Sequence, residues 1–139
     1  MAKCMVTQQQ LQPNPMSALA RDGIAESGII VPQPTADGFT PGPIRGWWPH
    51  GFNIRQLDMQ TGAYVPMHLR RESEVLFVQE GILEVTWDGG ALYMGPGDTL
   101  TIPIDLARAF RNTGSTPSKV FVVRGTDNPA PPTFVSAPV

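Results

Sequence analysis

The residues best suited to chemistry lie in two short segments of the chain. The first segment contains His68, Arg70 and Glu74, and the second contains Arg108. An imidazole or a carboxylate can bind a metal ion or move a proton, whereas a guanidinium donates hydrogen bonds and stays positively charged. Because side chains two positions apart on a strand share a face, His68 and Arg70 are expected to point the same way.

The spacing of the first segment places Gly62, His68, Glu74 and Gly81 in a fixed pattern. It resembles the first motif of the cupin superfamily: a glycine, five residues, His-x-His, three or four residues, a glutamate, six residues and a glycine. Every spacing agrees. The one departure is Arg70, which stands where the second histidine would be.

The second segment resembles the second cupin motif, which is a glycine, five residues, Pro-x-Gly, two residues, a histidine, three residues and an asparagine. Gly97, Pro103 and Asn112 occupy their places, while Asp105 replaces the glycine and Arg108 replaces the histidine. Two motifs in the right order imply an all-β fold, the cupin-type double-stranded β-helix or jelly-roll barrel.

In metal-bearing cupins, three histidines and one glutamate of these motifs hold iron, manganese, nickel or zinc. This chain keeps only His68 and Glu74 of that set. A guanidinium has no lone pair to give, and each one repels a cation about 4 Å away by roughly 4 kcal/mol at an effective dielectric near 20. We therefore expect no cofactor. The alternative is a divalent transition metal (Fe, Mn, Ni or Zn) on His68 and Glu74, helped by a further donor such as His50.

The same arginines favour negative charge. Arg70 and Arg108 offer forked donors suited to a carboxylate or phosphate, and Glu74 would neutralise one of them. We predict a locally positive, arginine-lined pocket in which His68, Arg70, Glu74 and Arg108 bind a small organic anion, a carboxylate or phenolate, in a pathway that stays unassigned. A second interpretation remains open, in which Arg70, Glu74 and Arg108 form an internal ion-pair network that only fills the barrel.

Two further functions stay open. The chain could be an enzyme, either a metal-dependent dioxygenase or decarboxylase using His68 and Glu74, or a metal-free isomerase, cyclase or lyase with one of them as general base. Alternatively, the N-terminal arm and the aromatic residues Trp47, Trp48 and Phe52 could serve partner binding.

The elements that position these residues are short strands separated by turns, consistent with 14 glycines and 15 prolines. We expect an extended Pro-rich arm over residues 1–47 that packs on the barrel or a partner subunit, with one short helix within 16–27. The barrel should span 48–126 and an extended tail 127–139. Strands are predicted at Asn53–Met59, Ala63–Leu69, Glu74–Gln79, Ile82–Trp87, Ala91–Met94, Asp98–Ile102, Ala107–Arg111 and Lys119–Arg124. Phe77, Trp87 and Phe121 are assigned to the core.

The overall composition argues against several kinds of partner and site. The net charge of −2 favours neither nucleic acid nor a membrane surface as a partner. The single cysteine, Cys4, cannot form an internal disulfide or a thiolate zinc site. No apolar stretch is long enough to span a bilayer, so we expect a cytoplasmic protein. The resemblance to cupins also implies a homodimer.

Overall fold

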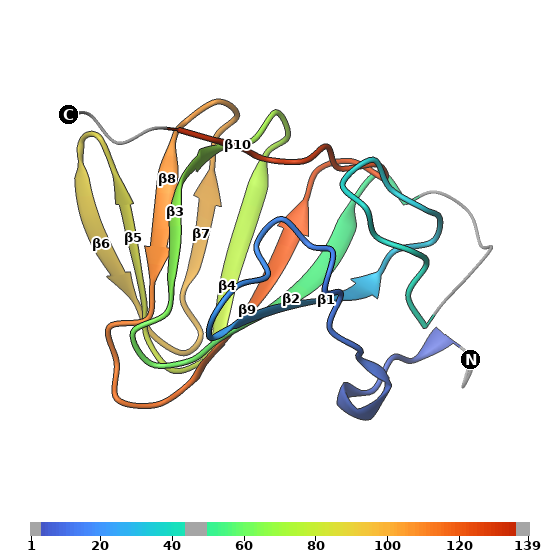
Figure 1. The fold of residues 1–139 in the computed structure, drawn as a ribbon, viewed down its shortest axis with the longest axis horizontal. Helices are drawn as coiled ribbons and strands as arrows, with labels where there is room; N and C mark the ends of the chain where they lie inside the picture. Colours follow the sequence, from blue (N-terminus) through green and yellow to red (C-terminus); the bar gives the residue numbers. More distant parts are fainter. Residues whose placement is uncertain (1–3, 44–49, 136–139) are drawn as a thin grey trace.

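The computed structural model describes residues 4–43 and 50–135, and in it these residues form two five-stranded antiparallel sheets around one core (Figure 1). The first sheet has the order β1–β2–β9–β4–β7, made of Ile24–Ile30, Asn53–Met59, Ser118–Arg124, Glu74–Glu80 and Thr99–Ile102. The second has the order β10–β3–β8–β5–β6, made of Thr133–Phe134, Tyr64–Leu69, Arg108–Arg111, Leu83–Trp87 and Gly90–Met94. A 3-10 turn, η2, covers Gln8–Gln10. No helix in these two ranges is long and apolar enough to cross a bilayer.

The eight strands predicted from the alternation of side chains are all present, each within one residue of its predicted bounds. Strand β9 shows the cause: buried and half-buried residues alternate along its whole length, with Val120 and Val122 among the buried ones. One face of such a strand can enter the core while the other faces outward. The all-β jelly-roll prediction is confirmed.

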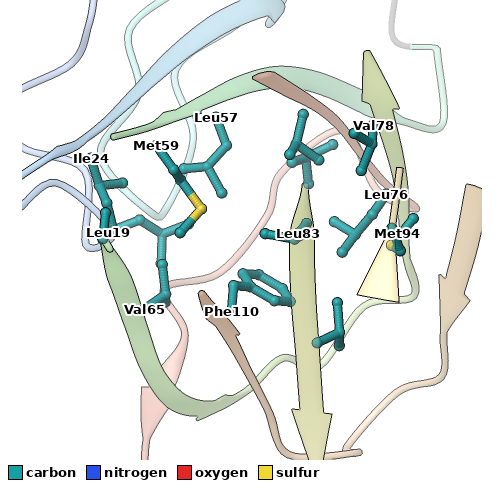
Figure 2. Packing of buried hydrophobic residues seen from close by; sticks show 14 of the residues in the cluster. Leu19, Ile24, Leu57, Met59, Val65, Leu76, Val78, Leu83, Met94 and Phe110 are labelled. Carbon is teal, nitrogen blue, oxygen red and sulfur yellow. The ribbon is translucent and has the colours of Figure 1, made fainter. Parts of the chain in front are cut away.

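The core lies between the two sheets, which both contribute to it (Figure 2). Leu57 and Leu76 come from the first sheet, and Leu83 and Phe110 from the second, all at 1% exposure or less. The assignment of Phe77 to the core is wrong, because that ring is 38% exposed. Its neighbours Leu76 and Val78 take the inward positions, so the pleat turns Phe77 outward.

On the outer face, Phe77 stacks on Phe121 with ring centroids 6.3 Å apart. Phe121 is half-buried there, so it too lies outside the core, and Trp87 is half-buried as well. The face of the sheet that turns inward therefore decides that Phe77 and Phe121 lie outside the core.

The short helix predicted within residues 16–27 is wrong. Turns occupy residues 15–22, and β1 follows as an edge strand in register with β2, with Glu26 opposite Leu57. Gly23 separates the turn from the strand with a φ of 75°. Pairing with the open edge of β2 satisfies backbone groups that an isolated short helix would leave in water, so tertiary context overrides the local propensity.

The C-terminal segment also adds a strand. Thr133 pairs with Leu69 and Phe134 with His68, so β10 lies along β3. Trp47 and Trp48 of the predicted aromatic cluster lie outside the described residues. Phe52 is 38% exposed.

The backbone around the motif residue Gly81 leaves no room for any residue other than glycine. Its φ is 78°, and a Cβ there would lie 2.7 Å from the carbonyl oxygen of Pro117 and 2.8 Å from Cα of Ser118. Gly62 has a similar φ of 80° but meets nothing within 4 Å. The two glycines thus share a left-handed backbone and differ in the space around them.

We expect Gly81→Ala to lower the free energy of unfolding by at least about 2 kcal/mol more than Gly62→Ala. Both variants carry a left-handed penalty of about 1 kcal/mol, and only the first drives a methyl group into backbone. Urea unfolding of both variants checks this. Equal losses would contradict the steric account of Gly81.

Candidate functional site

Strands β3, β4 and β8 bring the four predicted site residues into the interior. His68 lies in β3, Glu74 begins β4, Arg108 begins β8, and Arg70 directly follows β3. Their side chains are buried, with residue exposures between 0% and 2%. Register explains the meeting, because His68 pairs with Arg108 across the second sheet.

A bulge in β3 sets the orientation of the His68 side chain. The register with β8 shifts between Val65 and His68, around Pro66, which has no N–H for the ladder. The carbonyl oxygen of Pro66 lies 2.8 Å from Nδ1 of His68. The imidazole packs edge-on against Phe110, with centroids 5.4 Å apart, and 5.7 Å from Phe134 of β10.

His68 is held neutral. Burial lowers the pKa of its imidazole to about 4, although the Pro66 carbonyl and the Glu74 carboxylate pull it upward. A neutral ring that donates Nδ1–H to Pro66 leaves a lone pair on Nε2. That Nε2 atom is buried and has no hydrogen-bond partner among the described residues.

The two carboxylate oxygens of Glu74 differ in their hydrogen-bond partners. Its Oε2 accepts a hydrogen bond of 3.0 Å from Nε of Arg124 and lies 3.4 Å from Nε of Arg70. Its Oε1 is buried with no partner in the described part of the chain. Burial alone would raise the pKa of this carboxyl, but Arg124, then Arg70 and Arg108, outweigh it and hold the pKa below its usual range.

Arg124 is a central residue that the motifs did not reveal. Besides Glu74, it contacts Glu26 of β1 through Nη1, at 3.1 Å from Oε2. Although burial lowers it, Glu26 and Glu74 together raise the pKa of Arg124 above its usual value. Its inward position on β9, two residues after the buried Val122, is the sequence signal that could have identified it.

The ion-pair chain continues from Glu26 into the N-terminal segment. Glu26 accepts a 2.6 Å hydrogen bond from Ser17 and lies 4.0 Å from Nη1 of Arg55. Arg55 in turn makes a two-point contact with Asp37, and its guanidinium lies 3.7 Å over the Phe39 ring. At the other end, Arg70 Nη1 lies 3.2 Å from Glu72. The network therefore runs from the segment before β2 to the motif residues.

The pocket that we predict to be locally positive lies within a wider buried cluster of charges. The buried cluster holds four arginines, Arg55, Arg70, Arg108 and Arg124, and four carboxylates, Glu26, Asp37, Glu72 and Glu74. Its formal charges sum to zero when all are ionised. Positive charge is nevertheless concentrated at one place, because within residues 4–43 and 50–135 Arg108 has no carboxylate oxygen within 4 Å.

Arg108 differs from Arg70 in this respect. Arg70 belongs to the ion-pair chain and also donates a 3.3 Å hydrogen bond to the carbonyl of Ala130. Arg108 donates one hydrogen bond, from Nη2 to the carbonyl of Pro103 at 3.3 Å. Its Nε and Nη1 are buried without any partner among the described residues. The pKa of Arg108 is lowered, chiefly by burial.

A cavity of about 140 Å³ adjoins Arg108. Its other lining residues are almost all apolar and come from β5, β6, β7 and the following turn: Val85, Trp87, Leu92, Leu100, Thr101, Ile102, Pro103 and Leu106. The turn is held by a hydrogen bond from the Asp105 N–H to the Arg70 carbonyl, at 3.0 Å. Asp105 has a φ of 62°, which explains why the family motif prefers glycine there.

The donor set does not fit the four-ligand metal site of metal-bearing cupins. Only His68 Nε2 and Glu74 Oε1 offer lone pairs, and guanidinium groups occupy the other two motif positions. In the part of the chain that the structure describes, no group of three His, Cys, Asp or Glu residues could hold a metal ion. The ring of His50 stacks on Phe52, with centroids 5.4 Å apart, and the backbone N–H of His50 donates a hydrogen bond to Oδ1 of Asp127.

We expect Arg124→Met to lower the free energy of unfolding by about 3 kcal/mol or more, since it leaves Glu26 and Glu74 buried with one partner fewer. Lys119→Met on the same strand is the matched control. Lys119 makes a 3.9 Å pair with the exposed Glu80, so its loss should cost less than about 1 kcal/mol. Similar losses from the two variants in urea unfolding would contradict the central role of Arg124.

The pKa of His68 sets a pH dependence. Its folded value of about 4 lies below the ordinary 6.5, so on acidification the unfolded chain takes up the proton first. The stability that the neutral His68 contributes is complete above pH 6.5 and is lost between pH 6.5 and 4. The loss amounts to about 2 kcal/mol between pH 7 and pH 5. In His68→Gln that loss should vanish. Urea unfolding at pH 7, 6 and 5 measures it, and an unchanged slope in the variant would contradict a neutral His68.

Comparison with known proteins identifies the fold. The polyketide cyclase RemF from Streptomyces resistomycificus superposes with a TM-score of 0.73 at 15% identity, covering 96% of this chain and 86% of that chain. An RmlC-like cupin from Shewanella frigidimarina NCIMB 400 gives 0.63 at 17% identity, covering 88% and 90%. The DMSP lyase DddQ from Ruegeria pomeroyi DSS-3 gives 0.68 at 23% identity, covering 91% and 60%. No curated protein matches the sequence. A family model described as a cupin domain matches residues 55–124, which is half of the chain, and the chain therefore belongs to the cupin family.

Proposed function

We propose that this protein is a small-molecule-binding cupin whose barrel receives a small organic anion, a carboxylate or phenolate, at Arg108. The observation that carries the proposal is the buried guanidinium of Arg108, which has two nitrogens without a partner and no carboxylate within reach among the described residues. A buried charge in that condition destabilises the protein unless something else compensates it.

The surroundings of Arg108 support an anion as that compensation. Arg70 and Arg124 are already paired to Glu74, so they offer no uncommitted charge. His68 is neutral and adds none. An acceptor with a full negative charge would therefore find its strongest partner in Arg108.

A metal-free reaction is the second candidate, favoured by the state of His68. A neutral imidazole, oriented through Nδ1 and with a bare Nε2, is arranged as a proton acceptor. An anion bound nearby would raise the pKa of His68 and make it a better base. The role would be removal of a proton from the bound anion, as in an isomerase, cyclase or lyase. The proteins with a similar fold have different named activities, a cyclase and a lyase among them, so the fold alone does not indicate a reaction.

The anion proposal predicts opposite effects of Arg108→Met on stability and on binding. Without ligand, the variant should be as stable as the natural chain or more stable by about 1–3 kcal/mol, because it removes two orphaned donors. With millimolar monocarboxylates at constant ionic strength, the natural chain should gain melting temperature and Arg108→Met should not. Arg111→Met is the matched control, since Arg111 lies on the same strand but is exposed over Tyr64.

Two outcomes would contradict the proposal. The first is a stabilisation by carboxylate that Arg108→Met retains. The second is elemental analysis that finds one transition metal per chain, lost in His68→Gln, which would favour the metal-dependent alternative. The expected homodimer and cytoplasmic location stay predictions.

A further inference from the structure

The cavity beside Arg108 has a size and a chemistry that narrow the class of ligand. Its volume is about 140 Å³, and its wall consists of aliphatic side chains together with Trp87, Thr101 and Arg108. An apolar cavity of about 150 Å³ is enough to hold a benzene-sized molecule and stays dry when nothing binds. A ligand as small as acetate would leave most of this space unfilled.

The charge around the cavity limits the ligand to one negative charge. Arg108 is the one charged residue among those that line it. The other arginines of the buried cluster are paired with carboxylates, and the cluster as a whole is formally neutral. A second negative charge on the ligand would have no partner among the residues that line the cavity.

Resting on the proposed function, we propose that the ligand is a ring-sized apolar monoanion, of the class of a monocyclic aromatic or alicyclic monocarboxylate. Its ring occupies the cavity between Val85, Leu92 and Leu100, and its charged group meets Nε or Nη1 of Arg108. These nitrogens have no solvent access, so the guanidinium must turn toward the cavity when the ligand binds, and it then loses the hydrogen bond from Nη2 to the Pro103 carbonyl.

Entry would then pass the turn after β7. This turn forms one wall of the cavity through Pro103 and Leu106, and it carries 55% exposed Ile104 and 37% exposed Leu106. The hydrogen bond from Arg108 to the Pro103 carbonyl is long, at 3.3 Å, and therefore weak, so it breaks at low cost when the ligand enters.

The test compares probes that differ in one property each, by calorimetry at fixed ionic strength. Benzoate is the expected ligand class, acetate lacks the ring, benzamide lacks the charge, and terephthalate carries a second charge. We expect benzoate to bind about tenfold or more tighter than acetate, because burial of the ring surface adds to the charge contact. Benzamide and terephthalate should bind more weakly than benzoate by a similar factor.

Variants at Leu92 test the cavity itself. Leu92→Phe should fill it and remove the preference of benzoate over acetate without removing acetate binding. Leu92→Ala should enlarge it and shift the preference from benzoate toward 1-naphthoate, which keeps the test decisive if the first variant folds poorly.

The outcomes separate the two proposals. Equal binding of acetate and benzoate, each dependent on Arg108, would overturn the ring-sized class and leave the anion site standing. Absence of any Arg108-dependent binding by all the carboxylates would overturn both. Binding of benzamide equal to that of benzoate would also overturn both, because the charge would then play no part.

Discussion

Arg124 sits in the middle of the first sheet, buried, with Glu26 on one side and Glu74 on the other. Carboxylate partners offset the cost of burying the Arg124 guanidinium, and the guanidinium does the same for each of these carboxylates. The contact therefore ties the edge strand β1 to the central strand β9 and fixes one oxygen of the motif glutamate. The N-terminal segment becomes part of the site's support through this contact, since Glu26 comes from that segment.

The two arginines that replace motif histidines have different roles. Arg70 lies within reach of Glu72 and Glu74 and extends the ion-pair chain that begins at Asp37. Arg108 stands apart from that chain, against an apolar cavity, with most of its donors unsatisfied. The charges of the first arrangement compensate one another and the charge of the second is uncompensated, which is why the proposed function rests on Arg108.

The cupin barrel supplies positions rather than chemistry. A histidine, a glutamate and two further inward side chains meet wherever the two motifs fold together, and the residue types then decide whether the interior holds a cation or an anion. Here burial keeps His68 neutral, Glu74 stays ionised against three arginines, and Arg108 remains the uncommitted charge. The ligand that we propose for this interior therefore has a charge of the opposite sign to the metal ion of metal-bearing cupins.

The sequence by itself determined the eight main strands, the all-β class and the burial of His68, Arg70, Glu74 and Arg108, because strand alternation and motif spacing are local properties. Only the tertiary structure decided that β1 is a strand rather than a helix, that Phe77 lies outside the core, and that Arg124 pairs both with Glu74 and with Glu26, which lies 98 residues earlier in the chain. Those outcomes depend on which edge, face or charge is nearby after folding. Pairing between segments far apart in the chain leaves no trace in the spacing of neighbouring residues.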